Sequence, residues 1–372
     1  MTRPQTQYDI QSVISVFETT GFFKSGHRYG NGHINDTFYV ETDDGKYILQ
    51  RVNQHVFHEP VRLMENVLRV TRHVRTKMEE RGKDADRHSL NLVKAEEGNH
   101  WHIDADGNVW RLYLYVDNTV GYDIVETADQ AAEGGRAFGE FQSMLVDLPG
   151  ERLHDTIPDF HNMEKRLSTF FNAVAADCAT RCAAASREIR FVETRAHDMC
   201  LFVRLGRDGK LTERTTHNDT KFNNVLLDKD SDLAVCVIDL DTVMPGYVLY
   251  DFGDSIRTAT NTGSEDDLNL DRVGINLDLF EGYTKGYLAE ARSFLTEEEK
   301  AQLAYSARVM TFIIGLRFLS DYIDGDHYFR VHRPHHNLER ARAQFKLLET
   351  MERDYSQMVD IVGSQYDDGG PA

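Results

Sequence analysis

The sequence predicts an α+β protein of two lobes, a small β-rich N-terminal lobe and a larger, mainly helical C-terminal lobe. Up to about residue 117, short apolar runs alternate with turns rich in Gly, Asn and Asp. From about residue 119 onward, apolar residues recur instead at helical spacing. A chain of 372 residues is also longer than a usual single domain. We therefore expect lobes at 1–117 and 118–364, followed by a disordered tail at 365–372.

Charge and composition limit the classes of partner. The chain carries 42 basic and 61 acidic residues, a net charge of −19, which disfavours nucleic acids and anionic membranes as partners. We find no apolar signal segment at the start and expect no segment to approach the length of a membrane span, so a cytoplasmic protein is predicted. The four cysteines lack paired metal-site spacing, and we expect reduced thiols: Cys178, Cys182, Cys200 and Cys236.

The N-terminal lobe is predicted to begin with a helix at 10–21, where apolar residues have helical spacing. Strands at 38–42 and 46–52 follow, joined by the turn at 43–45. The segment before them, YGNGHINDT, contains Gly30, Gly32 and His33. A glycine turn between strands lets backbone amides approach phosphate, so these three residues are candidate nucleotide contacts.

The remaining elements follow the same periodicities. A helix is predicted at 61–82, with Leu63, Val67, Val70 and Val74 on one face. An apolar strand then ends the first lobe at 110–116. From their place in the order of the chain, the residues after it are candidate contacts for the adenine edge of a nucleotide: Tyr115, Val116 and Asp117.

The C-terminal lobe is predicted from long amphipathic segments. Helices are expected at 128–148 and 163–174. Another, at 296–325, opens with Thr296 and Glu299 in the spacing of a capping box.

The segment from residue 216 to 246 carries the clearest chemical signal. Asp219 follows His217 by two residues, and Asn224 follows Asp219 by five. Apolar runs at 225–227 and 234–238 predict a hairpin, which brings Asn224 close to Asp239. The pattern HxDxxxxN followed by a strand-borne Asp is typical of protein-kinase-like phosphotransferases.

The chemistry of phosphoryl transfer accounts for these residue types. Catalysis depends on placing an acceptor oxygen in line with the γ-phosphorus of ATP and on neutralising phosphate charge. Asp219 is the candidate for the first task. Asn224 and Asp239 offer the oxygen ligands that Mg²⁺ prefers, so they are the candidate metal ligands. His217 is expected to brace the loop rather than transfer a proton.

Several longer strings resemble the aminoglycoside-phosphotransferase-like small-molecule kinases, and within them the bacterial N-acetylhexosamine 1-kinases. These strings are HNDTKFNN, VIDLDTVMPG, LYDFGDSIR, YGNGHINDTFYV and RFLSDYIDGD. The resemblance implies a two-lobed protein-kinase-like fold and transfer from ATP, with Mg²⁺, to the anomeric hydroxyl of N-acetylglucosamine or N-acetylgalactosamine. It also implies that the sugar is contacted by Asp219, Asp241, Thr242 and Arg317.

The sequence departs from the wider superfamily at the strand lysine that usually binds the nucleotide phosphates. Its place falls in YILQRVN, where the chain has Gln50 and Arg51. Because neighbouring residues of a strand point to opposite faces, only one of the two can face the nucleotide, and the sequence leaves open which. If Gln50 does, an ion pair with Glu59 or Glu65 is absent.

The sequence is compatible with other interpretations. Arg317 could form a salt bridge with Asp254 or Asp321 in place of a ligand contact. Asp251 and Asp254 are expected to be scaffold acids, with a helix beginning at Ser255. The acceptor could also be an aminoglycoside or a choline-type alcohol, and a nucleotide-binding pseudokinase is a further alternative. The preference between the two N-acetylhexosamines, the oligomeric state and the extent of lobe closure are not predicted.

Overall fold

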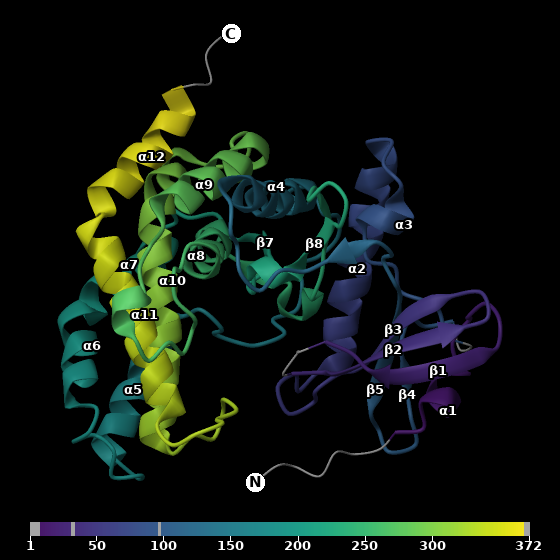
Figure 1. Ribbon diagram of the computed structural model, residues 1–372, viewed down its shortest axis with the longest axis horizontal. Helices are drawn as coiled ribbons and strands as arrows, with labels where there is room; N and C mark the ends of the chain where they lie inside the picture. The colour runs from purple at the N-terminus through teal and green to yellow at the C-terminus, as the bar shows by residue number, and fades with distance from the viewer. Residues whose placement is uncertain (1–7, 31–33, 96–97, 368–372) are drawn as a thin grey trace. The chain divides into compact units, whose positions relative to one another are not determined.

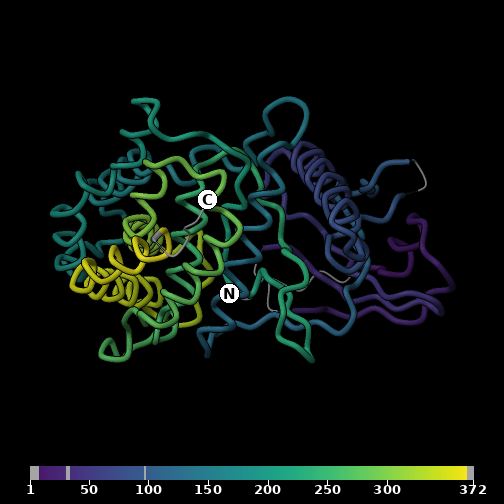
Figure 2. The backbone as a smooth tube through the Cα atoms, turned by 90° about the horizontal axis from the view of Figure 1, so that it is seen from above, coloured from purple at the N-terminus to yellow at the C-terminus, as the bar shows by residue number. Residues whose placement is uncertain are grey.

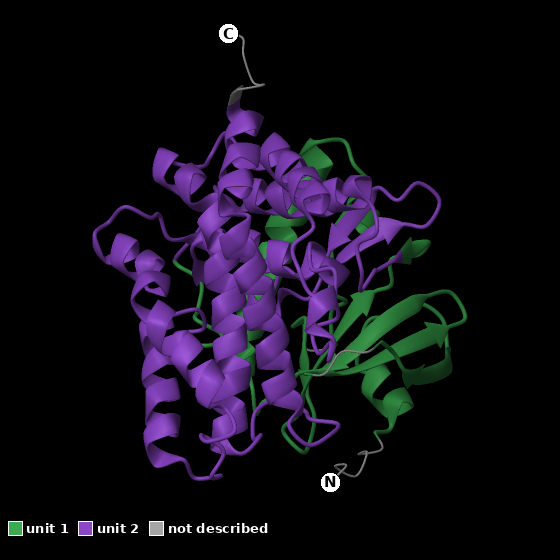
Figure 3. Ribbon diagram, turned by 60° about the vertical axis from the view of Figure 1, so that its left-hand side comes forward, with its two compact units in different colours: residues 1–119, 152–157 green, residues 120–151, 158–372 purple. Residues whose placement is uncertain are grey.

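A computed structural model gives the structure of the protein and describes residues 8–30, 34–95 and 98–367. The chain forms two compact units (Figure 3). Unit 1 comprises residues 1–119 and 152–157, and unit 2 comprises residues 120–151 and 158–372. The last helix continues to Asp367, into the segment expected to be a tail.

Unit 1 is built on a five-stranded antiparallel sheet (Figure 1). The strand order is β1-β2-β3-β5-β4. The strands are β1 (Phe23–Arg28), β2 (Asp36–Thr42), β3 (Lys46–Arg51), β4 (His102–Ile103) and β5 (Val109–Leu114). The predicted turn at 43–45 joins β2 to β3, so the period-2 pattern identified this hairpin correctly.

The helices of unit 1 are α1 (Ile10–Ile14), α2 (Pro60–Glu80) and α3 (Ala85–His88). The predicted apolar face of α2 is buried, as helical spacing requires. The helix expected at 10–21 is wrong beyond Ser15. Phe17 instead forms an isolated β-bridge with Ala95 and packs into the small core of the sheet, so tertiary contact overrides helical spacing there.

Unit 2 is mainly helical and contains two small antiparallel pairs of strands, β7 with β10 and β8 with β9, and β6, whose first residue ends unit 1, lies next to β8. The helices α10 and α11 run side by side (Figures 1 and 2). The α-helices are α4 (Ala128–Leu145), α5 (Met163–Ala176), α6 (Ser186–Met199), α7 (Leu201–Arg207), α8 (Val248–Ala259), α9 (Leu277–Ala291), α10 (Glu297–Asp324), α11 (His336–Arg353) and α12 (Tyr355–Asp367). The strands are β6 (Thr119–Val120), β7 (Arg214–Thr216), β8 (Val225–Asp228), β9 (Ala234–Val237) and β10 (Met244–Gly246).

Two helices of unit 2, α4 and α9, approach each other at glycines. A Cβ atom at Gly135 would lie 2.2 Å from the carbonyl oxygen of Tyr283, and one at Gly286 would lie 1.9 Å from that of Ala132. Only glycine permits backbones this close. The close packing brings Tyr287 of α9 within hydrogen-bond distance of Gln142 of α4, at 2.6 Å.

The helix α10 corrects one expectation about membrane spans. Its 28 residues are long and apolar enough to cross a membrane by length and composition, and it is the single such helix found among the described residues. The capping box of Thr296 and Glu299 is present at its start, as predicted. Because 72% of its apolar window is buried inside the protein, it has the character of a core helix, and one such helix is weak evidence for a membrane span.

Candidate active site

The loop after β7 carries Asp219 and is held by its neighbours. Thr216 at the end of β7 pairs with Met244 of β10. The fully buried His217 ring places Nε2 2.9 Å from the carbonyl oxygen of Ile238; because a carbonyl only accepts, Nε2 carries the proton. Nδ1 then accepts from the backbone amide of Asp219 at 3.3 Å. His217 therefore braces the loop, in agreement with the role expected for it.

The buried Asp251 of α8 holds the same loop by hydrogen bonds. Its carboxylate accepts from the backbone amides of His217 and Asn218, at 2.8 and 2.7 Å, and from the side-chain amide of Gln142 at 2.7 Å. Gln142 in turn accepts from Tyr287. A chain of hydrogen bonds thus joins α9, α4 and α8 to the loop. The helix expected to begin at Ser255 is wrong at its start, because α8 begins at Val248 and Asp251 lies in its first turn.

The predicted hairpin places Asn224 beside Asp239. Val225 of β8 pairs with Val237 of β9, and the amide of Ile238 donates to the carbonyl of Asn224 at 2.9 Å. The side-chain nitrogen of Asn224 donates to the carbonyl of Asp219 at 2.7 Å. This bond fixes the amide orientation and leaves the amide oxygen as the acceptor for a cation.

Asp239 occupies a strained position after β9. Its φ of 62° is left-handed, a conformation that aspartate adopts more readily than most residues. Desolvation, followed by the negative charges of Asp241 and Asp219, raises the pKa of Asp239 to about 6. Because the Asp239 side chain is exposed to solvent, we attribute the raised pKa mainly to repulsion by the two neighbouring carboxylates. A bound cation would relieve this repulsion.

Lys221 is a residue of this loop that the sequence interpretation passed over. Its Nζ lies 3.0 Å from Oδ1 of Asp219. Burial by itself raises the pKa of the Asp219 carboxyl, but the charge and hydrogen bond of Lys221, together with the other neighbouring groups, outweigh burial and leave that pKa below its ordinary value. The signal was available, since Lys221 lies two residues from Asp219 inside the string HNDTKFNN.

Asp241 and Thr242, predicted to contact the sugar, lie in the short 3-10 turn after Asp239, at Leu240–Thr242. Both are buried. The Thr242 hydroxyl donates to the carbonyl of His217 at 2.7 Å, and the Thr242 carbonyl accepts from the side chain of Asn218 at 3.0 Å. The structure therefore gives Thr242 a bracing contact with the loop.

Arg317 of α10 lies among aromatic rings. Its guanidinium carbon is 5.1 Å from the ring centroid of Phe160, 5.6 Å from that of Tyr328 and 5.4 Å from that of Phe329. Nη2 also lies 3.4 Å from the hydroxyl of Tyr328. Such positions suit cation–π contacts.

The salt bridge considered for Arg317 is not formed. Asp254 pairs with Arg257, and Asp321 accepts from the backbone amides of residues 327–329. Within the described ranges, no carboxylate pairs with Arg317.

A second arginine, Arg166 of α5, lies near Arg317. It donates to the carbonyl of Phe160 at 3.0 and 2.6 Å. Burial, followed by the charge of Arg317, lowers the pKa of Arg166 to about 10. Phe160 is followed by His161, whose ring bonds the carbonyl of Asn218, so this arginine pair lies beside the loop that carries Asp219.

In unit 1, the sheet register settles which face Gln50 occupies. Gln50 pairs across the sheet with Arg111, whose guanidinium donates to the Gln50 amide oxygen at 3.0 and 2.8 Å and lies 3.9 Å from the sulfur of Met64 on α2. Arg51 points to the opposite face, where it bonds Asp36 at 2.6 Å. Gln50 therefore shares the face that α2 covers.

The glutamates considered as partners for a strand lysine are engaged elsewhere. Glu59 pairs with Arg62 at 2.7 Å, and Glu65 lies 2.9 Å from Nε2 of His154. Both glutamates therefore have partners outside β3.

The other predicted nucleotide contacts also belong to unit 1. Gly30 has a φ of +75° and open space around its Cα, whereas Gly32 and His33 lie outside the described residues. After β5, the amide of Tyr115 donates to the carbonyl of Lys46, and Asp117 pairs with the Lys46 ammonium at 2.6 Å. Val116 is buried, and its carbonyl accepts from Thr119.

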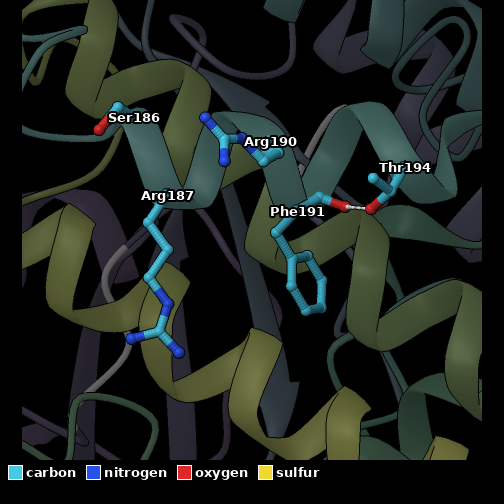
Figure 4. A pocket seen from close by; sticks show the side chains of 5 residues that line it. All are labelled: Ser186, Arg187, Arg190, Phe191 and Thr194. Carbon is cyan, nitrogen blue, oxygen red and sulfur yellow. Dashed lines mark hydrogen bonds between the residues drawn. The ribbon is translucent and has the colours of Figure 1, made fainter.

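A cavity of about 390 Å³ lies along α6 (Figure 4). Its lining side chains are Ser186, Arg187, Arg190, Phe191 and Thr194. Arg187 and Phe191 extend to one side of the helix and Arg190 to the other, so the two arginines do not converge. All five residues come from one helix that carries none of the predicted site residues, and we assign the cavity no part in catalysis.

Comparisons with known proteins identify the family and the fold of the chain. The profile of the phosphotransferase enzyme family matches residues 25–288. The fold is similar to an aminoglycoside phosphotransferase from Alicyclobacillus acidocaldarius subsp. acidocaldarius DSM 446, with a TM-score of 0.61 and 13% identity over 99% of this chain and 98% of that chain. It is also similar to a microcompartment-associated aminopropanol kinase, with a TM-score of 0.56 and 18% identity over 94% and 97% of the two chains. A third similar structure is a choline kinase from Cryptosporidium parvum Iowa II, with a TM-score of 0.52 and 13% identity over 93% of this chain and 94% of that chain.

Proposed function

The chain belongs to the phosphotransferase enzyme family, and from that premise we propose that it transfers the γ-phosphate of ATP to the anomeric hydroxyl of an N-acetylhexosamine. The fold and the family support a small-molecule kinase. The arrangement of Asp219, Asn224 and Asp239 on one loop and one hairpin supports phosphoryl transfer, since it supplies an acceptor-orienting carboxylate and two oxygen ligands.

Asn224 and Asp239 are the residues that would hold magnesium. They fit a hard cation, because one offers an amide oxygen and the other a carboxylate whose pKa is raised by desolvation and then by neighbouring negative charge. When bound, the ion neutralises charge on the phosphate oxygens. Among the described residues, no group of three or more His, Cys, Asp or Glu side chains could hold a metal ion. Magnesium on a nucleotide usually has one or two protein ligands, and phosphate oxygens and waters complete its coordination.

Asp219 would orient the acceptor hydroxyl and take up its proton. Because its pKa lies below the ordinary value, Asp219 is ionised and is a weak base. An anomeric hydroxyl is more acidic than an ordinary alcohol, so orientation with late proton transfer is sufficient. Lys221 lies beside this carboxylate and is placed to offset negative charge during transfer.

The pair of Arg166 and Arg317 is the observation from which we infer the chemical class of the acceptor. Both guanidiniums lie beside the Asp219 loop, and neither has a carboxylate partner in the described ranges of the chain. Two guanidinium charges repel an ammonium group. Their N–H groups donate good hydrogen bonds to hydroxyl and acyl oxygens. This local charge favours an uncharged sugar over the amine-bearing acceptors named for the structural relatives.

A panel of acceptors tests the proposal. ADP release is measured with ATP, Mg²⁺ and, in turn, N-acetylglucosamine, N-acetylgalactosamine, choline, aminopropanol and an aminoglycoside. We expect turnover with the two sugars. Phosphorylation at the anomeric carbon also removes the reducing end, so the product must fail a reducing-sugar assay.

The outcomes separate the alternatives. Turnover with an amine acceptor alone would assign the chain to an aminoglycoside- or choline-type activity. Nucleotide binding without turnover of any acceptor would instead indicate a pseudokinase.

A further inference from the structure

His161 is a buried histidine outside the HxDxxxxN motif. It lies just before α5 and is 7% exposed. Its ring packs between two aromatic rings, with centroid distances of 4.4 Å to Phe160 and 5.0 Å to Tyr250. Nε2 lies 3.1 Å from the carbonyl oxygen of Asn218. The ring is therefore fixed by packing and aimed at the residue that precedes Asp219.

The partner defines the tautomer of this histidine. A carbonyl oxygen only accepts, so Nε2 carries the proton and donates it. Nδ1 is then a lone-pair acceptor, and it has no hydrogen-bond partner in the described part of the chain. Burial, followed by the charge of Arg317, lowers the pKa of His161 to about 3, so the ring stays neutral and keeps this donor at ordinary pH.

The carbonyl that His161 holds belongs to the peptide bond between Asn218 and Asp219. Asn218 has a φ of 64°, a left-handed conformation that its surroundings must maintain. Asp251 holds the Asn218 amide, and the carbonyl of Thr242 holds its side chain. Within the described residues, the Asn218 carbonyl accepts from the His161 ring. Rotation of this peptide would change the direction in which the Asp219 side chain leaves the backbone.

We propose that His161 is a positioning residue for phosphoryl transfer, which fixes the peptide between Asn218 and Asp219 and thereby the direction of the Asp219 carboxylate. The inference rests on the proposed kinase function. As a positioning residue, His161 would act through Asp219 and not on the substrate, so its contribution lies in the rate of the aligned step and not in substrate affinity. A displacement of about 1 Å in a reacting group can cost roughly 100-fold in rate.

Two substitutions separate the hydrogen bond from the packing of the ring. His161→Phe keeps an aromatic ring between Phe160 and Tyr250 but removes the donor. His161→Gln restores an N–H donor on a side chain of similar reach. The matched control is His100→Phe, since His100 is equally buried at 7%, also has a lowered pKa caused first by burial, and lies in unit 1.

We expect His161→Phe to lower kcat by about 10- to 100-fold while KM for ATP and for the acceptor changes less than about twofold. His161→Gln should recover most of this loss, and His100→Phe should leave kcat near the wild-type value. If His161→Phe does not fold, His161→Met makes the same comparison. A wild-type kcat in the folded donor-free variant would overturn the proposal, as would equal losses in the Gln and donor-free variants.

Hydrogen–deuterium exchange tests the hold on the loop without turnover. Peptides that cover residues 216–221 should exchange faster in His161→Phe than in the wild type, in His161→Gln and in His100→Phe. Unchanged exchange would overturn the proposal. If the wild type phosphorylates no acceptor, the proposed function fails, while this measurement still reports whether His161 holds the peptide.

Discussion

The ammonium nitrogen of Lys221 lies 3.0 Å from Oδ1 and 3.1 Å from Oδ2 of Asp219. Both oxygens of the candidate catalytic carboxylate therefore share one positive charge. The contact helps to hold Asp219 ionised, because the charge and hydrogen bond of Lys221, together with the other neighbouring groups, outweigh the effect of burial on its pKa. It also gives the loop two separable parts, a carboxylate that orients the acceptor and a cation that sets the ionisation of that carboxylate.

Asp219→Asn should abolish most turnover. The amide keeps the shape of the side chain but cannot accept a proton, so kcat should fall by roughly 10²- to 10⁴-fold, the usual contribution of a positioned acid or base. Affinity for ATP, measured by calorimetry, should change little. A variant with near-normal kcat would remove Asp219 from the catalytic role.

Lys221→Met should shift the acid limb of the kcat profile. Lys221 holds the pKa of Asp219 below its ordinary value, so Asp219 is protonated only at low pH in the wild type. Without the lysine that pKa rises, and activity should be lost at a higher pH as the solution is acidified. Lys221→Arg keeps the charge and should keep the wild-type limb. An identical limb in the Met variant would show that Lys221 does not control Asp219.

Arg317→Ala should weaken binding of the acceptor. Loss of a hydrogen bond from a charged donor costs about 1.5–3 kcal/mol, or a roughly 10- to 100-fold rise in the acceptor KM. The KM for ATP should stay within about twofold. Arg187→Ala, which removes an exposed arginine of α6, is the control. A lost ATP affinity in Arg317→Ala would mean that this arginine serves the nucleotide.

The hairpin and the spacing of Asp219, Asn224 and Asp239 could be predicted from the sequence because they depend on local periodicity. Apart from His217, the contacts that hold the loop could not be predicted. Asp251 lies 33 residues from Asn218 and 109 from Gln142. Such contacts are created by helix packing, and no local pattern encodes them.

Gln50 and Arg51 show a second limit. Alternation along a strand predicts that the two side chains point to opposite faces, but not which face is which. The structure decides by register, since Gln50 lies opposite Arg111 and Arg51 lies opposite Trp110. The predicted helix does not continue to Gly21 for a related reason. Phe17 forms a β-bridge with Ala95, a contact that the local spacing of apolar residues does not reveal.

Asp239→Asn should raise the Mg²⁺ requirement. The variant loses a charged ligand, so the Mg²⁺ concentration that gives half-maximal rate should increase by more than about tenfold. In the wild type the pKa of Asp239 is about 6, raised by desolvation and then by Asp241 and Asp219, so protons should compete with the metal below that pH and the requirement should rise between pH 7 and 5. This pH dependence should weaken in the variant. A requirement that is the same at both pH values in wild type would argue against Asp239 as a ligand.

Asp251→Asn should lower both stability and turnover. The buried carboxylate accepts from two backbone amides and from Gln142, whereas an asparagine has one acceptor oxygen and adds two donors. At least one buried donor must therefore lose its partner, at a cost of about 1–3 kcal/mol. Thermal unfolding measured by calorimetry should show a lower Tm.

The activity of the same variant distinguishes an anchor from a merely buried acid. Because the lost bonds end at His217 and Asn218, the loop should loosen, and kcat should fall at temperatures where Asp251→Asn is still fully folded. Asp278→Asn, an exposed acid in the first turn of α9, should change the stability by no more than about 0.5 kcal/mol and leave kcat intact. If Asp251→Asn lowers Tm but keeps the wild-type kcat below its unfolding transition, Asp251 stabilises unit 2 without setting the position of Asp219.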